Sequence, residues 1–146
     1  MTNQYKLGNL VIVAPGEWED ITDEMDDPDA PFTLAKEFGV GALQFSVAEY
    51  QSGDLPKFTL SDLEALRHEF ANHRGLARPF DAILIDGNFM VSGGSYHVDE
   101  DLMRVWYCSN GEDVVLVTYV ADWSERNGEA TECDEILSKS RFEKSI

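Results

Sequence analysis

The sequence predicts an α+β fold, in which an antiparallel β-sheet is flanked by two or more helices. Apolar runs and alternating segments bounded by turn residues are typical of strands, and they recur along the chain. Two segments carry apolar residues at helical spacing, and turns such as Asn110-Gly111 join neighbouring strands too tightly for a parallel connection. At 146 residues the chain has the size of one domain, so we expect a single domain over residues 1–146.

Three strands are predicted before the first helix. Residues 10–14 (LVIVA) form an apolar run closed by Pro15-Gly16, which is typical of a buried strand ending in a turn. Residues 31–35 (PFTLA) suggest a second, short strand. Residues 40–50 alternate, which predicts a half-buried strand whose inward face carries Leu43, Phe45 and Val47.

The first helix is predicted to begin at Ser61. Residues 61–64 (SDLE) match a capping box, in which the first and last side chains satisfy free amides of the first turn. An apolar stripe of Leu63, Leu66 and Phe70 would face the core, and Gly75 would end the helix. Basic residues near its C-terminal end would suit the helix dipole: Arg67, His68, His73 and Arg74.

Two hairpins and a second helix follow. Residues 82–85 and 89–91 flank an Asp-Gly-Asn turn, and residues 103–108 and 114–120 flank a Ser-Asn-Gly turn. The helix is expected over residues 128–139, with its apolar face made by Ala130, Cys133, Ile136 and Leu137.

The two cysteines are expected to be free. Cys108 and Cys133 are too few for a disulfide framework, and each sits in an apolar pattern typical of a buried, reduced thiol. Reduced thiols favour a cytoplasmic location. The first fifteen residues lack a basic leader with a long apolar stretch, and no window approaches a membrane span, so neither a signal peptide nor a membrane segment is expected.

Three strings in the chain carry a family resemblance. They are Pro15-Gly16-Glu17-Trp18 followed by Asp20, Val105-Trp106-Tyr107 before the Ser-Asn-Gly turn, and residues 136–142 (ILSKSRF). With the order of elements, they resemble the PsbP-like superfamily, which includes the PsbP protein of photosystem II and a yeast Ran-binding import factor. The resemblance implies a curved antiparallel sheet between helices, an α/β/α sandwich, and binding rather than catalysis. It transfers no active-site residue.

Charge is the strongest functional signal. The net charge is −17, and residues 17–29 (EWEDITDEMDDPD) hold eight carboxylates without a lysine or arginine. Such a chain repels nucleic acid and anionic membranes and attracts basic surfaces, so the expected partner is a basic protein. A solvated loop that only keeps the protein soluble is the alternative. If the segment docks a partner, the expected contact residues are Glu17, Trp18, Glu19, Asp20, Asp23, Glu24, Asp26 and Asp27.

The three tryptophans receive different expectations. Trp106 lies in an apolar strand and is expected in the core. Trp18 and Trp123 stand among acidic residues, so each is either a lid over the core or an exposed anchor for a partner.

Catalytic and metal-binding patterns are weak. Ser95 and His97 lie close together with acids behind them, but the nucleophile elbow is missing, and Gly93-Gly94 more simply suggests a strand connection. The acidic segment does not match a calcium loop, and the three histidines lack zinc-ligand spacing. We therefore expect no catalytic residues, no metal and no cofactor. An enzyme that uses carboxylates as acid and base remains the alternative.

Together these observations predict a non-catalytic cytoplasmic binding protein. A small, acidic, leaderless chain resembles the bacterial immunity proteins that neutralise a toxin inside the cell, which implies an immunity or inhibitor role towards a basic toxin or effector. A module that binds a small GTPase or a transport component is the second hypothesis, and the oligomeric state stays open.

Overall fold

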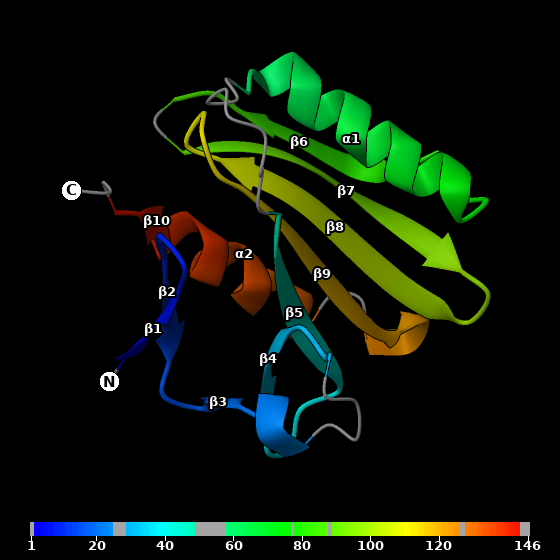
Figure 1. Cartoon of the computed structure of the whole chain (residues 1–146). Helices are drawn as coiled ribbons and strands as arrows, with labels where there is room; N and C mark the ends of the chain where they lie inside the picture. Colours follow the sequence, from blue (N-terminus) through cyan, green and yellow to red (C-terminus); the bar gives the residue numbers. More distant parts are fainter. Residues whose placement is uncertain are drawn as a thin grey trace.

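Two antiparallel sheets and two helices form the part of the chain that the computed structural model describes, residues 2–24, 29–48, 58–76, 78–87, 89–125 and 128–143 (Figure 1). The larger sheet has the order β3-β4-β5-β9-β8-β7-β6, and the smaller has the order β1-β2-β10. Their bounds are β1 Thr2–Leu7, β2 Leu10–Pro15, β3 Trp18–Asp20, β4 Phe32–Lys36, β5 Gly41–Ala48, β6 Phe80–Ile85, β7 Met90–Val98, β8 Asp101–Ser109, β9 Val114–Asp122 and β10 Arg141–Phe142. The helices are α1 Leu60–His73 and α2 Ala130–Lys139, with short 3₁₀ turns η1 Thr22–Glu24 and η2 Trp123–Glu125.

The helices cover opposite faces of the larger sheet, as Figure 1 shows edge-on. Successive side chains of a strand point to opposite faces of the sheet, and β7 makes contacts on both faces. Ser92 and Tyr96 accept hydrogen bonds from Arg67 of α1. Ser95 faces the other way and accepts from Arg104, which also donates to α2. The α+β class and the helix-flanked antiparallel sheet are therefore confirmed.

Most of the core lies between the larger sheet, α2 and β2. It holds Trp18, Phe45 and Trp106 from the sheet, and Cys133 and Ile136 from α2. Trp106 is thus a core residue, as expected. Two smaller clusters fill the space beneath α1, one around Leu63 and one around Ala71, Tyr96 and Val105.

The strands with a clear apolar pattern are confirmed. They are β2, β4, β5 and both predicted hairpins, β6–β7 and β8–β9, with registers that pair Ile85 with Val91 and Ser109 with Val114. On β5, Leu43 and Phe45 are buried and Val47 packs against the core. Three strands were not predicted: β1, β3 and β10.

Helix α1 begins earlier than predicted. Its capping box is formed by Thr59 and Asp62, since the Asp62 amide donates to Thr59 Oγ1 and the Thr59 amide donates to Asp62 Oδ2 at 2.9 Å. Ser61, the predicted cap, already lies inside the helix. Leu63 is fully buried, whereas Leu66 and Phe70 are half-buried. Gly75 follows the helix at a φ of 63°, which suits a glycine stop.

The glycine pair is not a strand connection, because Gly93 and Gly94 lie in the middle of β7. A Cβ at Gly93 would come within 2.7 Å of Trp106 Cδ1, and one at Gly94 within 2.9 Å of Pro79 Cβ. The two glycines therefore admit close packing on the two faces of the strand.

Both cysteines are buried and free, as predicted. Burial raises the pKa of the Cys108 thiol to about 12 and raises that of Cys133 as well, so both stay protonated at neutral pH. No helix in the described ranges has the length and apolar character to cross a membrane.

Candidate functional site

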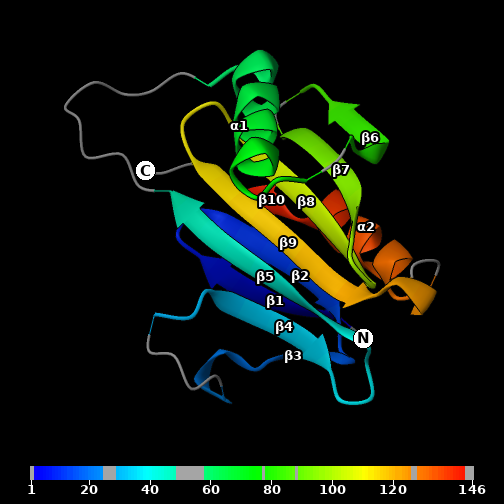
Figure 2. The same cartoon turned by 90° about the vertical axis from the view of Figure 1, so that its right-hand side faces the viewer.

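The predicted acidic contact residues lie along one edge of the larger sheet. Strand β3 is that edge, opposite β6 (Figure 2), and it carries Glu19 and Asp20, while Glu17 precedes it in the turn after β2. Asp23 and Glu24 follow on η1. All five side chains are exposed. The remaining two predicted contacts, Asp26 and Asp27, lie outside the described residues.

Of the two alternatives for Trp18, a lid over the core and an exposed anchor, the structure contradicts the anchor. The Trp18 side chain is 0% exposed and belongs to the core, so it is not available as an anchor for a partner. The alternation of β3 turns Trp18 inward while Glu19 points outward. Its carbonyl accepts a hydrogen bond from the Tyr5 hydroxyl at 3.1 Å, and the Lys36 ammonium lies 5.9 Å from its ring centroid.

Asp20, although exposed, makes hydrogen bonds that stabilise the local backbone. Its Oδ1 accepts hydrogen bonds from the Thr22 amide at 3.0 Å and the Thr22 hydroxyl at 2.6 Å. Thr22 Oγ1 in turn accepts from the amide of Thr33 at 2.9 Å. Asp20 therefore ties η1 to strand β4.

An exposed phenylalanine stands beside the acidic residues. Phe38, in the turn between β4 and β5, is 92% exposed. It lines a surface depression of about 290 Å³ together with Glu17, Glu19, Lys36 and Glu37. Sequence reasoning missed Phe38. The available signal was an aromatic residue between two predicted strands, where turns usually carry polar residues or glycine.

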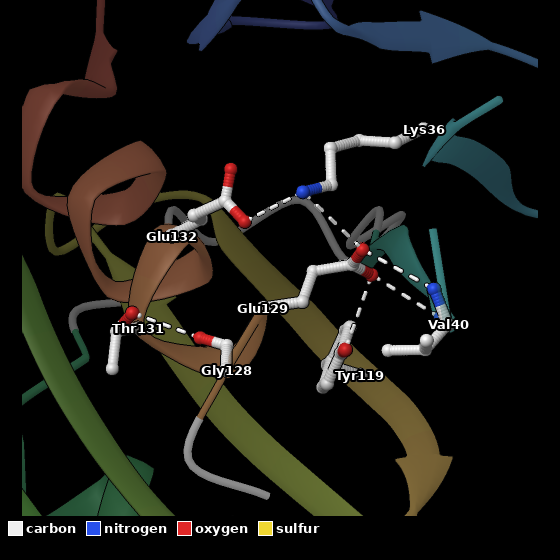
Figure 3. A network of polar contacts seen from close by, with 8 residues as sticks. Lys36, Val40, Tyr119, Gly128, Glu129, Thr131 and Glu132 are labelled. Atoms are coloured by element: carbon white, nitrogen blue, oxygen red, sulfur yellow. Dashed lines mark hydrogen bonds and ion pairs between the residues drawn. The ribbon is translucent and has the colours of Figure 1, made fainter. Parts of the chain in front are cut away.

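Glu129, at the start of α2, binds the backbone just after Phe38, where its carboxylate reaches Val40 (Figure 3). Glu129 Oε2 accepts from the amide of Val40 and Oε1 from the amide of Gly41, each at 3.2 Å. Oε1 also accepts from the Tyr119 hydroxyl at 3.1 Å. Glu129 is buried, so these donors replace the water that a carboxylate would otherwise require.

Lys36 completes this network. Its ammonium lies 2.7 Å from Glu132 Oε2 and 3.6 Å from Glu129 Oε2. The hydrogen bond to Glu132 raises the pKa of Lys36, and partial burial opposes that effect. Burial, followed by the nearby Glu129 charge, raises the pKa of Tyr119, so its hydroxyl remains a donor. Lys36 is thus engaged by α2 although it borders the depression.

Two glycines permit this close approach. A Cβ at Gly39 would lie 2.6 Å from Glu129 Oε2, and a Cβ at Gly41 would lie 2.5 Å from the carbonyl oxygen of Val120. Because atoms do not pack that closely, a side chain at Gly39 would displace the Glu129 carboxylate, and one at Gly41 would push the strand away from the backbone of β9.

The residues considered for nucleophilic catalysis have other partners. Ser95 is buried and accepts a hydrogen bond from Arg104 Nε at 2.9 Å. His97 is exposed and stacks on Trp123 with centroids 3.7 Å apart. That stack borders a second depression, of about 460 Å³, with Asp99, Glu100, Asp122 and Ser124. Within the described ranges no group of three or more His, Cys, Asp or Glu side chains is arranged to hold a metal ion.

The fold is similar to that of solved structures with low sequence identity. Cyanobacterial PsbP (CyanoP) from Synechocystis matches with a TM-score of 0.67 and 13% identity over 97% of this chain and 92% of that chain. The Ran-binding protein Mog1p from Saccharomyces cerevisiae matches with a TM-score of 0.62 and 9% identity over 97% and 95%. A protein from Pseudomonas aeruginosa described as a putative regulator matches with a TM-score of 0.51 and 14% identity over 94% of both chains.

At the level of sequence, no family model matches the chain, and no curated protein is significantly similar to it. The likeness to known proteins is therefore one of architecture, and it confirms the fold that the resemblance implied. This chain has the PsbP/Mog1-type fold.

Proposed function

We propose that this protein is a non-catalytic binding module that docks a basic protein partner through one edge of its larger sheet. The acidic edge comprises the exposed carboxylates of β3, η1 and the turns beside them: Glu17, Glu19, Asp20, Asp23, Glu24 and Glu37. Their gathering on one edge is the observation that carries the proposal. Lys36, the cation that borders them, is already paired with Glu132 and Glu129 of the same chain.

The physical role of the acidic edge is to steer association. A net charge of −17 produces a long-range field, and exposed carboxylates concentrate it where they gather. Rim charges of this kind act mainly on the association rate, and salt screens their interactions beyond a Debye length of about 8 Å at physiological ionic strength.

Two finer roles fit this proposal. The first is an immunity or inhibitor protein that covers a basic toxin or effector, in a cytoplasmic setting that the two free thiols favour. The second is a module that binds a small GTPase or a transport component. The architectural likeness to Ran-binding Mog1p supports the second role by analogy of fold.

Charge reversal tests the proposal. The variant Glu17→Lys, Glu19→Lys, Asp23→Lys, Glu24→Lys changes the acidic edge and leaves Asp20, which caps η1, in place. Its matched control reverses four exposed glutamates elsewhere, Glu69, Glu100, Glu112 and Glu135. Each reversal adds two charges, so four bring both variants from −17 to −9. The two variants therefore have the same net charge and differ in where the reversed charges lie.

Immobilised wild-type protein is used to capture partners from lysate at low salt, and each purified partner is then measured for its association rate across a salt series. We expect the edge variant to associate at least tenfold more slowly at low salt, with a smaller deficit at high salt, and the control variant to change far less. If the edge variant and wild type associate with the partner at equal rates, the acidic edge only keeps the protein soluble and does not steer association. A captured toxin that loses activity in the complex supports the inhibitor role, and a captured GTP-binding protein supports the second.

A further inference from the structure

Phe38 is the most exposed large apolar side chain among the described residues. Its ring is 92% exposed, whereas the other exposed apolar residues range from 36% for Phe80 to 53% for Leu84. Exposing a whole phenyl ring to water is unfavourable, although single apolar residues are common on protein surfaces and need no explanation. Phe38 differs from such residues because hydrogen bonds fix the turn that carries it.

The turn beneath Phe38 is constrained on both sides. The amide of Gly39 donates to the carbonyl of Lys36 at 3.0 Å, which closes the turn around Glu37 and Phe38. Glu129 then holds the next two amides, those of Val40 and Gly41, and connects them to Tyr119 of β9 (Figure 3). A side chain carried on a turn with fixed geometry loses less entropy when it binds, because its backbone is already ordered.

The surroundings of Phe38 define the chemistry of the partner. Glu17, Glu19 and Glu37 share its depression, so an aromatic residue stands among carboxylates. Binding hot spots are commonly aromatic and are surrounded by a polar rim that excludes water. The complementary surface has an apolar centre and a ring of lysine or arginine. A second copy of this chain does not fit, because it would place carboxylates against carboxylates.

We infer that Phe38 is the apolar anchor of the acidic edge and seats its ring on an apolar patch at the centre of the partner's basic surface. This inference rests on the proposed function and names the contact that slows dissociation. Glu129 acts here as a positioning residue that holds the turn.

The test uses two synthetic helical peptides as stand-ins for the partner surface. One has a leucine face flanked by lysines, and the other has the same lysines with every leucine replaced by alanine. Each is titrated into the full chain, and amide NMR shifts give both the position of binding and the dissociation constant. For the leucine peptide we expect the largest shifts at residues 36–41 and 17–20, and we expect Phe38→Ala to raise its dissociation constant at least tenfold. The alanine peptide should bind wild type and Phe38→Ala equally.

Leu84→Ala is the matched control. Leu84 is 53% exposed and lies on β6, at the opposite edge of the larger sheet, so its loss should leave both dissociation constants unchanged. Because Phe38 packs little against the chain, the thermal midpoint of Phe38→Ala should equal that of wild type.

The outcomes separate this inference from the proposed function. If Phe38→Ala binds the leucine peptide as tightly as wild type while the four-residue edge variant loses binding, the anchor is refuted and the acidic edge stands. If the edge variant binds normally and Phe38→Ala does not, charge steering is refuted and only an apolar contact remains. Sedimentation that shows a wild-type dimer, absent in Phe38→Ala, would assign the turn to a second copy and overturn the inference.

Discussion

Nη1 of Arg67 donates a hydrogen bond to the hydroxyl of Tyr96 at 3.1 Å, in the space between α1 and β7. Nε of the same guanidinium donates to Ser92 Oγ, also at 3.1 Å. Arg67 is only 4% exposed, so a cation of α1 is held within the protein by the hydroxyls of two neutral side chains. Burying a charge is costly unless its hydrogen bonds are satisfied, and each of these contacts therefore affects stability.

Removing the Tyr96 hydroxyl should destabilise the protein. Tyr96→Phe leaves one buried, charged donor without its acceptor, so we expect the free energy of unfolding to fall by about 1–3 kcal/mol, measured by urea denaturation. The double variant Arg67→Met, Tyr96→Phe should lose less than the sum of the single losses, because it removes both sides of the contact. Additive losses would show that the two groups are not coupled.

Replacing Glu129 by glutamine should loosen the turn that carries Phe38. Glutamine has one carbonyl oxygen, so it accepts either from Val40 or from Gly41 and Tyr119, and its amide nitrogen faces the remaining donors. We expect a loss of about 1–3 kcal/mol and faster hydrogen exchange at the amides of Val40 and Gly41. Glu132→Gln is the control, since that carboxylate is partly exposed and should contribute less than about 1 kcal/mol. Unchanged exchange at both amides would contradict the assigned role of Glu129.

Adding a methyl group to Gly93 should be destabilising. The new Cβ would lie 2.7 Å from Trp106 Cδ1, and the indole is buried, so relief requires a shift within the core. We expect Gly93→Ala to lower the free energy of unfolding by about 1–3 kcal/mol in urea. At Gly128 the nearest atom to a new Cβ would be the Glu125 carbonyl oxygen, at an ordinary contact distance of 3.6 Å, so Gly128→Ala should be near neutral. If the two substitutions change the free energy of unfolding equally, Trp106 does not pack against Gly93 as described.

Stability should decline above pH 9, partly through Cys108. Burial raises the pKa of this thiol to about 12 in the folded protein, while the unfolded thiol ionises near pH 9. Because the pKa is higher in the folded than in the unfolded protein, the stability that the protonated Cys108 contributes is fully present below the unfolded pKa. That stability is lost as the pH rises towards 12. Between pH 8 and 10.5, wild type should therefore lose about 1–2 kcal/mol more than Cys108→Ala. Each protein is compared with itself at the two pH values, so the stability that the alanine variant loses through its cavity cancels out. Equal losses would mean that Cys108 ionises in the folded state.

Local patterns predicted the strands whose own residues specify them. The hairpins around Asn110-Gly111 and Gly87, the apolar run of β2 and the alternation of β5 are all short-range signals. Strand β1 has a largely polar sequence (TNQYKL), and β10 has two residues, so both depend on hydrogen bonding to β2 rather than on a pattern of their own. The buried state of Arg67 was equally hidden, because its acceptors Ser92 and Tyr96 lie more than twenty residues away.

The charge composition predicts the acidic residues of the candidate site but not its apolar residue. The acidic residues Glu17 and Glu19 were identified from charge alone, and they are exposed. The acidic residues around Trp18 in sequence allow either an exposed anchor or a lid over the core, and strand alternation turns the side chain into the core. The sequence marks Phe38 only as an aromatic residue between two predicted strands, and its place beside the acidic residues follows from the pairing of β3 with β4.

The pairing of β2 with β10 has a consequence for synthesis. Val13 and Ser140 are joined by a hydrogen bond although they are 127 residues apart, and Val11 pairs with Arg141. Of the two described strands that pair with β2, only β1 precedes it in the chain, and a lone two-stranded hairpin is marginally stable in water. The core cluster that buries Leu10 and Ile12 is complete only when Cys133, Ile136 and Leu137 of α2 have been made. A nascent chain that stalls before residue 130 therefore presents a hydrophobic strand, which is the kind of segment that chaperones bind and that promotes aggregation.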